Sequence, residues 1–470
     1  MRPKVVSRIM GRFMLVFSAI LVLPFLTGLY YSEPFSRLYP FLVAALSSFL
    51  AGLVMKWSGN GSNPSVREAM VSTVLGWSIA VILSGLPFVP ELGFVDAFFE
   101  ASAGLTTTGI SMVLKPESLP RSLLFWRSLM QWVGGLGILT FFIAVIRESG
   151  GISRRLFTAE THKSDPGSIR PSLKKSITEL WRVYGFITSV MIGTYIALGM
   201  PVFDSVLHAF SGLSTGGFST HSASIGYFSE TVQAATIPFM LLGGTNFAIL
   251  YKLFQGEGEA LRNSEFKLYG QIFILVSLAM ILDLGAGRFL DAVFQAASII
   301  SSTGYGTMSV MAFSAVLQMA VIGVMFVGGS VGSTSGGVKI FRLKTLIEMV
   351  KTRLRSYSLP ETAINEVKLD EEILDRSALH TVAVLFFTWI GFIFIGTLLT
   401  LLFDDISLAA ALSGVVSAAG NMGPVYMSGA EMQQLTWASK FVWIFLMLAG
   451  RLEMLPVLAI FNRSIFPDSK

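Results

Sequence analysis

The sequence predicts an all-α polytopic membrane protein. Of its 470 residues, 53% are hydrophobic and only 13% are charged, and the mean hydropathy is +0.68. Soluble domains carry about 25% charged residues, so this composition indicates a chain that lies mostly in lipid. Apolar runs of roughly 20 residues, the length that crosses ~30 Å of hydrocarbon, recur along it. Between these runs a short glycine-containing string occurs four times, which indicates a repeated unit.

Each string is a polar residue, any residue, a glycine, and then a bulky or stiff residue. The four strings are Thr107-Thr108-Gly109-Ile110, Thr215-Gly216-Gly217-Phe218, Ser302-Thr303-Gly304-Tyr305 and Asn421-Met422-Gly423-Pro424. Glycine accepts backbone angles that side chains forbid, so such a loop can line up carbonyl oxygens, which replace the hydration shell of K+ in channels. One string alone is more often a turn or packing element. Four at equivalent places predict a single pseudo-fourfold cation path in each chain.

The residues around the strings follow a common order. An aspartate stands 13 residues before the first three glycines and is expected to cap a short helix: Asp96, Asp204 and Asp291. The fourth copy lacks this register, and Asp404 and Asp405 lie further upstream. About 25 residues after each string glycine, an apolar run carries another glycine: Gly134, Gly243, Gly328 and Gly450. The predicted unit is therefore an outer helix, a short re-entrant helix, a filter loop and an inner helix.

This unit divides the chain into an N-terminal two-helix extension (1–66) and four pore repeats: 67–175, 176–262, 263–376 and 377–470. The first two helices are expected over 13–31 and 39–55. Outer helices are expected over 71–86, 177–198, 266–284 and 379–403, re-entrant helices over 96–106, 204–214, 291–301 and up to 419, and inner helices over 123–146, 232–253, from 310, and over 435–461. These make ten spans. A secretory signal is the alternative interpretation of the first helix, but no small-residue cleavage site follows it.

Basic residues set the expected orientation. Seven of them fall in the polar loop that ends the first repeat: Arg147, Arg154, Arg155, Lys163, Arg170, Lys174 and Lys175. Cytoplasmic loops carry such an excess, so both termini are predicted to be cytoplasmic. The net charge of +5 is explained by these loops, and no nucleic-acid partner is expected.

A glycine-rich stretch interrupts the third inner helix. It includes Gly328, Gly329, Gly332, Ser333, Thr334, Ser335, Gly336 and Gly337. Each glycine costs a helix about 1 kcal/mol relative to alanine, so this stretch is expected to be a loop. Irregular backbone at membrane depth must be buried in protein or line a wet cavity, and a flexible loop there could act as a gate. Arg451, sixteen residues into the last inner helix, is a candidate partner; the alternative is snorkelling, or pairing with Glu453 or another buried group.

The four strings, the 328–337 stretch and Gly450-Arg451-Leu452-Glu453 together resemble the Trk/Ktr/HKT superfamily of potassium transporters, and its bacterial TrkH branch above all. The resemblance covers nearly the whole chain. It implies a potassium uptake protein of the bacterial cytoplasmic (inner) membrane, with K+ at the strings as the transported ion and no tightly bound cofactor. It also implies an arginine, here Arg451, that faces the glycine loop. Glycine at all four string positions favours K+ over Na+ within the family.

The resemblance further implies a homodimer that docks on a cytoplasmic, TrkA-like nucleotide-binding regulatory subunit. A K+/H+ or K+/Na+ symporter is the alternative function, although the strings contain no titratable residue suited to proton coupling. A membrane enzyme with an intramembrane site is the remote alternative. The sequence shows no nucleophile–base pair, nucleotide-binding loop or metal-binding histidine spacing, and it has no cysteine. Gln131, Asn246 and Lys252 are expected to be packing, pore-lining or interfacial residues.

Overall fold

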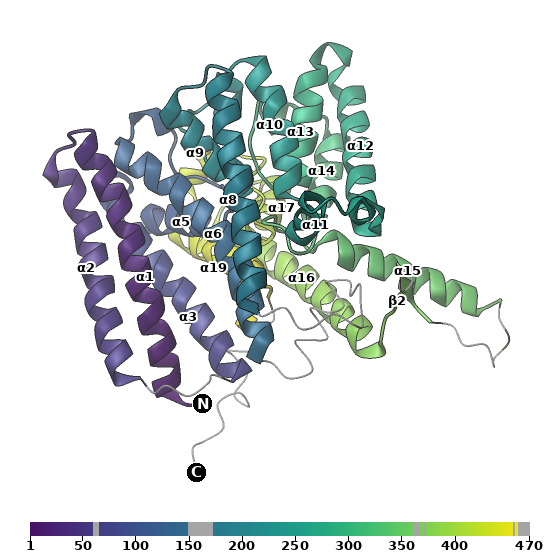
Figure 1. Cartoon of the computed structure of the whole chain (residues 1–470). Coiled ribbons are helices and arrows are strands. Elements are labelled where there is room, and N and C mark those ends of the chain that lie inside the picture. Colours follow the sequence, from purple (N-terminus) through teal and green to yellow (C-terminus); the bar gives the residue numbers. More distant parts are fainter. Residues whose placement is uncertain are drawn as a thin grey trace.

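The computed structural model describes residues 1–59, 65–148, 173–358, 360, 366–370, 372–454 and 456–458. Apart from loops, these residues are helical, with one exception. This is a short hairpin, in which the two-residue strands β1 (Lys368–Leu369) and β2 (Glu372–Ile373) pair. The predicted helical class is therefore confirmed (Figure 1). The basic stretch with Arg154, Arg155, Lys163 and Arg170 lies outside the described residues.

Two long N-terminal helices lie side by side at one edge of the molecule (Figure 1). These are α1 (Pro3–Tyr30) and α2 (Phe35–Ser58). Their backbones approach closely because glycines lie between them: a Cβ on Gly11 would stand 2.5 Å from the backbone nitrogen of Lys56. Ser48 Oγ donates a hydrogen bond to the carbonyl of Met14 at 2.8 Å, which also ties the pair together.

The rest of the chain presents one order of elements four times. Long helices come first: α3 (Val66–Gly85), α8 (Leu173–Ala197), α12 (Ser264–Leu284) and α16 (Arg376–Phe403). A short helix then leads into each string: α5 (Phe94–Leu105), α9 (Val202–Leu213), α13 (Phe289–Ile300) and α17 (Leu408–Gly420). After the strings come α6 (Arg121–Glu148), α10 (Glu230–Gly243) with α11 (Phe247–Phe254), α14 (Ala315–Val327) with α15 (Ile340–Ser356), and α18 (Gly429–Gln434) with α19 (Trp437–Arg451).

The second inner helix is broken, which corrects the continuous helix expected over 232–253. The chain bends by 105° between α10 and α11. The last carbonyls of α10 are taken by another segment, because Ser330 N donates to Gly244 O at 3.0 Å and Thr334 N donates to Gly243 O at 3.2 Å. Asn246 then caps α11 by accepting a hydrogen bond from Ala248 N. Asn246 is thus a helix cap, and the break accommodates the glycine loop.

The last inner helix also stops earlier than expected. It ends at Arg451, and the backbone turns because Glu453 and Met454 adopt φ of 65° and 47°. Met454 N donates to Ala449 O at 2.7 Å, which closes this turn. The expected end at 461 lies outside the described residues.

The three aspartates do not cap their helices, so that prediction is wrong. The caps are Gly93, Pro201 and Arg288, and the aspartates lie in the first turn. There a negative charge still favours the helix N-terminus. The carboxylates bind groups from beyond the helix: Thr220 Oγ1 donates to Asp204 at 2.6 Å, Thr307 Oγ1 donates to Asp291 at 2.7 Å, and Lys440 Nζ donates to Asp96 at 2.7 Å. In the second and third units the aspartate therefore ties the start of the short helix to the segment just after its string.

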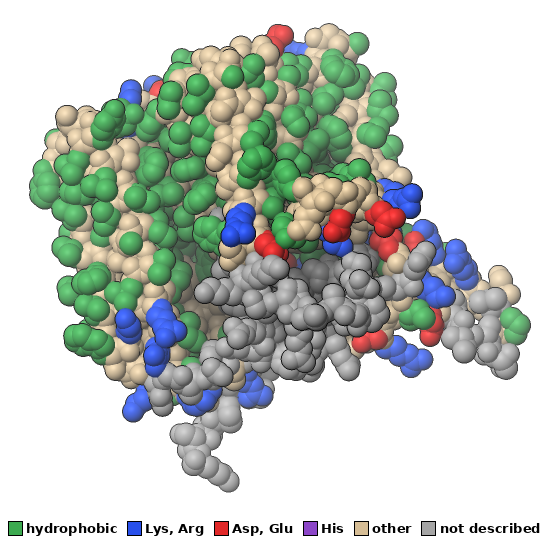
Figure 2. Space-filling model, viewed as in Figure 1, with side chains coloured by type: hydrophobic (Ala, Val, Ile, Leu, Met, Phe, Trp, Pro, Cys, Tyr) green, Lys and Arg blue, Asp and Glu red, His purple; other side chains and the backbone are tan. Residues whose placement is uncertain are grey.

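The outer surface is apolar over a broad band (Figure 2). Leu282, Val316 and Leu402 are 85%, 82% and 72% exposed, the reverse of a soluble protein. Basic side chains gather near the end at which α1 begins (Figure 2). Among the described helices, five are long and apolar enough to cross a membrane, and six if the bent α10–α11 pair counts as one. The ten-span count stays a prediction.

Candidate functional site

The four strings share one strained backbone conformation. The residue two before each string glycine has a left-handed φ, although none of these residues is a glycine: Thr107 (54°), Thr215 (55°), Ser302 (57°) and Asn421 (50°). The string glycines follow with φ of 79°, 79°, 78° and 99°. Such angles are uncommon for residues with side chains and carry strain. Their recurrence at four matching positions indicates four loops of the same geometry.

These loops meet one another in a closed circuit. A Cβ built on each string glycine would approach the carbonyl oxygen that precedes the next string glycine. The contacts run from Gly109 to Gly216 O (2.2 Å), from Gly217 to Thr303 O (2.1 Å), from Gly304 to Met422 O (2.7 Å) and from Gly423 to Thr108 O (3.2 Å). The fourth contact returns to the first string. Segments more than 300 residues apart therefore converge on one small space that leaves no room for side chains.

Side chains of two strings bind neighbouring units instead of pointing into that space. The Tyr305 hydroxyl donates to His208 O at 2.9 Å and lies 2.7 Å from Ser211 Oγ, which joins the third string to α9. Asn421 Nδ2 donates to Thr108 Oγ1 at 2.8 Å, which joins the fourth string to the first. The large side chains of Ile110, Phe218 and Met422 are also buried in protein. The strings can therefore present only backbone and small hydroxyl groups to an ion.

Glycines on three inner helices lie against the carbonyl ends of the short helices. A Cβ on Gly134 would stand 2.0 Å from Leu105 O, one on Gly243 2.9 Å from Leu213 O, and one on Gly450 1.8 Å from Ala419 O. Gly328 differs, because it ends α14 and faces Gly336 O of the glycine loop at 2.1 Å. The sequence predicted that these four glycines occupy equivalent positions. Three of them pack in the same way, and Gly328 does not.

The glycine loop, residues 328–337, contacts several of these elements at once. Gly336 N donates to Ser302 Oγ of the third string at 2.8 Å. Thr334 Oγ1 donates to Leu213 O at the end of α9 and to Gly243 O at the end of α10, each at 3.0 Å. A Cβ on Gly336 would stand 1.8 Å from Gly420 O at the end of α17. The loop therefore lies directly against the ends of two short helices and the third string.

Arg451 meets this loop. Its Nη1 donates to Thr334 O at 2.8 Å and its Nη2 donates to Gly134 O at 2.9 Å, and the residue is 3% exposed. Snorkelling to the surface is thus excluded. Pairing with Glu453 is also wrong, because Glu453 instead binds Arg342 of α15 at 2.6 Å. The structure brings together the arginine and the loop that the sequence singled out.

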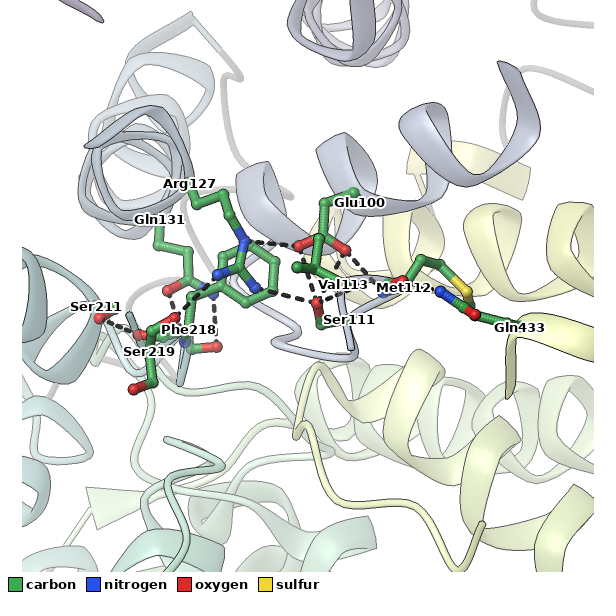
Figure 3. A network of polar contacts seen from close by, with 11 residues as sticks. Glu100, Ser111, Met112, Val113, Arg127, Gln131, Ser211, Phe218, Ser219 and Gln433 are labelled. Atoms are coloured by element: carbon green, nitrogen blue, oxygen red, sulfur yellow. Dashed lines mark hydrogen bonds and ion pairs between the residues drawn. The ribbon is translucent and has the colours of Figure 1, made fainter. Parts of the chain in front are cut away.

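One polar network beside the strings was not predicted from the sequence. Glu100 of α5 and Arg127 and Gln131 of α6 form bonds with the second string and with the residues that directly follow the first two strings (Figure 3). Glu100 and Arg127 were not singled out, and Gln131 was expected to be a packing or pore-lining residue. Charged residues within otherwise apolar helices were the available signal. Among the described residues, no group of three or more histidines and carboxylates could hold a metal ion.

An apolar surface, helices of membrane length and four glycine strings that share one buried space describe a cation-transport protein. The family model described as the cation transport protein TrkH matches residues 42–277 and 276–469. The chain belongs to this family, whose members are transporters and not enzymes. It is a multi-pass membrane protein.

Known proteins are similar to the chain over its full length. The Trk system potassium uptake proteins TrkH of Salmonella typhimurium and of Escherichia coli K12 are each 30% identical to it, over 100% of both chains. The crystal structure of the potassium transporter TrkH from Vibrio parahaemolyticus matches with a TM-score of 0.89 and 26% identity, and covers 99% of this chain and 100% of that one.

Proposed function

We propose that the chain mediates potassium uptake through a channel-like path lined by the four strings. The closed circuit of string contacts carries this proposal, because it gathers the carbonyls of Thr108, Gly216, Thr303 and Met422 in one place. Carbonyl oxygens replace the hydration shell of K+ in channels. Similar proteins over the whole length are named as Trk system potassium uptake proteins, which supports K+ as the ion.

The short helices favour a cation at this place. Their C-terminal ends lead into the strings, and the C-terminus of a helix carries a partial negative charge. The repeated order of elements supports a layout of four pore repeats, 67–175, 176–262, 263–376 and 377–470, after an extension of two helices. In this layout the chain crosses the membrane ten times and both termini are cytoplasmic.

The glycine loop and Arg451 form the gate in this proposal. The loop binds both the third string and the end of α9, so the ion path opens only if the loop moves. Arg451 holds the loop in the observed position and places a positive charge near the path. The loop continues into α15, and a homodimer with a TrkA-like cytoplasmic subunit would act on the gate from this helix.

Tracer flux into vesicles tests the proposal and separates it from symport. The purified protein is reconstituted, and Rb+ tracer uptake is driven by a K+ gradient alone, with no H+ or Na+ gradient. Uptake that proceeds under these conditions, and that external K+ inhibits far better than Na+, is the expected result. Uptake that requires a proton or sodium gradient would favour the symporter, and no uptake under any gradient would overturn the proposal.

A further inference from the structure

A buried polar network behind the first two strings is left unused by the proposed ion path (Figure 3). Its centre is formed by Arg127 and Gln131 of α6 and by Glu100 of α5. These residues are 2%, 0% and 0% exposed, although two of them are charged. Arg127 and Gln131 lie four residues apart, so their side chains leave the same face of the helix. Both point toward the second string (Figure 3).

Gln131 holds the peptide groups on both sides of Gly217. Its Nε2 donates to Gly216 O at 2.6 Å, and its Oε1 accepts from Phe218 N at 3.1 Å. The same carboxamide occupies the place of a side chain at position 216, where a Cβ would stand 2.3 Å from Gln131 Cδ. The other strings carry side chains at this position: Thr108, Thr303 and Met422. The second string has a glycine there because Gln131 fills the space.

Arg127 contacts the end of the second string and the residues that directly follow the first and second strings. Its Nη1 donates to Ser219 O at 2.9 Å, and its guanidinium carbon lies 4.2 Å from the centre of the Phe218 ring. Its Nη2 donates to Ser111 Oγ at 3.0 Å, and its Nε donates to Glu100 at 2.8 Å. The planar guanidinium can make these contacts together because its donors are fixed in a fork.

Glu100 anchors the arginine to the first string. Its carboxylate accepts from Met112 N at 2.8 Å and from Ser111 Oγ at 3.0 Å, just beyond that string. The charged pair belongs to the first unit alone. In the other units the residues nine before the string glycine, as Glu100 is before Gly109, are His208, Gln295 and Gly414. The residues seven before the inner-helix glycine, as Arg127 is before Gly134, are Thr236, Val321 and Trp443. The Glu100–Arg127 pair therefore holds one seam of the circuit, and the other units have neither residue at these positions.

We propose that Gln131 and Arg127 are positioning residues that set the discrimination between K+ and Na+ at the seam between the first and second strings. A smaller cation needs shorter distances to its oxygen ligands, so the carbonyls must shift to replace its hydration shell. Bonds from a buried carboxamide to Gly216 O and from a paired guanidinium to Ser219 O oppose that shift. The inference rests on the proposed function, because it assigns ion contact to the strings.

The test compares the ratio of K+ to Na+ permeability in vesicles with the flux per folded protein and with the melting temperature. Gln131→Leu removes both hydrogen bonds and keeps a similar volume, so the ratio is expected to fall about threefold to tenfold, as for one or two lost hydrogen bonds. Arg127→Ala leaves Glu100 unpaired and buried, which threatens folding. The double variant Glu100→Gln/Arg127→Met removes both charges, and it is expected to fold and to show a lowered ratio.

Asp96→Asn is the matched control. It weakens another ion pair of α5, Lys440–Asp96 at 2.7 Å, which binds none of the strings. It is expected to lower the melting temperature and leave the permeability ratio unchanged. If the permeability ratio falls equally in this control, the change in the Gln131 and Arg127 variants reflects a general loss of stability. That result would overturn the inference.

Gly109→Ser in the same assay distinguishes a failure of the positioning role from a failure of the proposed ion path. If Gly109→Ser changes the ratio while Gln131→Leu and the double variant keep the wild-type ratio, the positioning role is wrong and the ion path stands. If Gly109→Ser also leaves the ratio unchanged, the proposed function itself fails. A ratio lowered in all three variants, with the wild-type ratio in Asp96→Asn, is the result that the inference predicts.

Discussion

Arg451 donates a 2.8 Å hydrogen bond from Nη1 to the carbonyl oxygen of Thr334. The donor ends the last inner helix, and the acceptor lies in the glycine loop of the preceding unit, 117 residues earlier. Through Nη2 the same side chain also holds Gly134 of α6. The buried guanidinium of Arg451 therefore connects α19 and α6, from two different units, to the glycine loop.

Replacing Arg451 with alanine is expected to raise K+ flux. The variant loses two charge-assisted hydrogen bonds, each of about 1.5–3 kcal/mol: one holds Thr334 of the proposed gate loop, and the other holds Gly134 of α6. If the bond to Thr334 opposes opening of the proposed gate, flux per folded protein should rise at least about tenfold. Tracer uptake normalised to the monodisperse fraction measures this.

Arg451→Lys provides the control, since it keeps the charge but can no longer bridge two carbonyls with a fixed fork. We expect a flux between those of the wild type and the alanine variant. If Arg451 has only a structural role, both variants should lower yield and melting temperature, and neither should conduct more than the wild type.

The sequence predicted the elements near the strings well because local patterns encode them. Composition indicated the membrane class, and glycines at equivalent spacings marked the four loops whose left-handed φ the structure records. Arg451 and the glycine loop were also paired correctly, through the resemblance to known transporters. These features depend on residues close together in the chain, or on a family pattern.

The errors concern contacts between distant segments. Asp204 looked like a helix cap, but its carboxylate instead accepts a hydrogen bond from Thr220 beyond the string. The break in the second inner helix depends on amides of the glycine loop that bind Gly243 and Gly244. The pairing of Glu100 with Arg127 depends on how α5 packs on α6. No periodicity within one segment carries this information.

Gly450→Ala is expected to destabilise the protein strongly. The added Cβ would stand 1.8 Å from Ala419 O, a backbone atom at the end of α17 that cannot rotate away. Overpacking of this kind typically costs about 1–3 kcal/mol. Gly137→Ala is the matched control, because among the described residues its Cβ would meet only Trp77, at 3.5 Å, an ordinary contact. Thermal unfolding in detergent should separate the two, and equal melting temperatures would contradict the packing described.

The bond between Asp291 and Thr307 should show energetic coupling. Thr307 Oγ1 donates to Asp291 Oδ1 at 2.7 Å and ties the end of the third string segment to the start of α13. A double-mutant cycle with Asp291→Ala and Thr307→Val is expected to give a coupling of about 0.5–3 kcal/mol in stability. Purely additive effects would show that this bond does not hold the loop.

Topology can be tested by cysteine labelling, because the native chain has no cysteine. A cysteine at Ser164, in the basic stretch, should react with an impermeant reagent only from the cytoplasm. One at Ser118, which precedes α6, should react only from outside. Opposite accessibility of the two positions would overturn the proposed orientation and the ten-span count.

The reversal potential under opposed K+ and Na+ solutions tests most directly whether the four strings select the ion. The measurement compares the reconstituted wild type with Gly109→Ser, Gly217→Ser, Gly304→Ser and Gly423→Ser. Gly285→Ser is the control, because Gly285 also has a positive φ of 85° but, in the part of the chain that the structure describes, no atom within 4 Å of its Cβ position. The account predicts a strongly K+-selective potential in the wild type and in Gly285→Ser, and reduced selectivity or lost current in the string variants. An unchanged potential in all four string variants would contradict it.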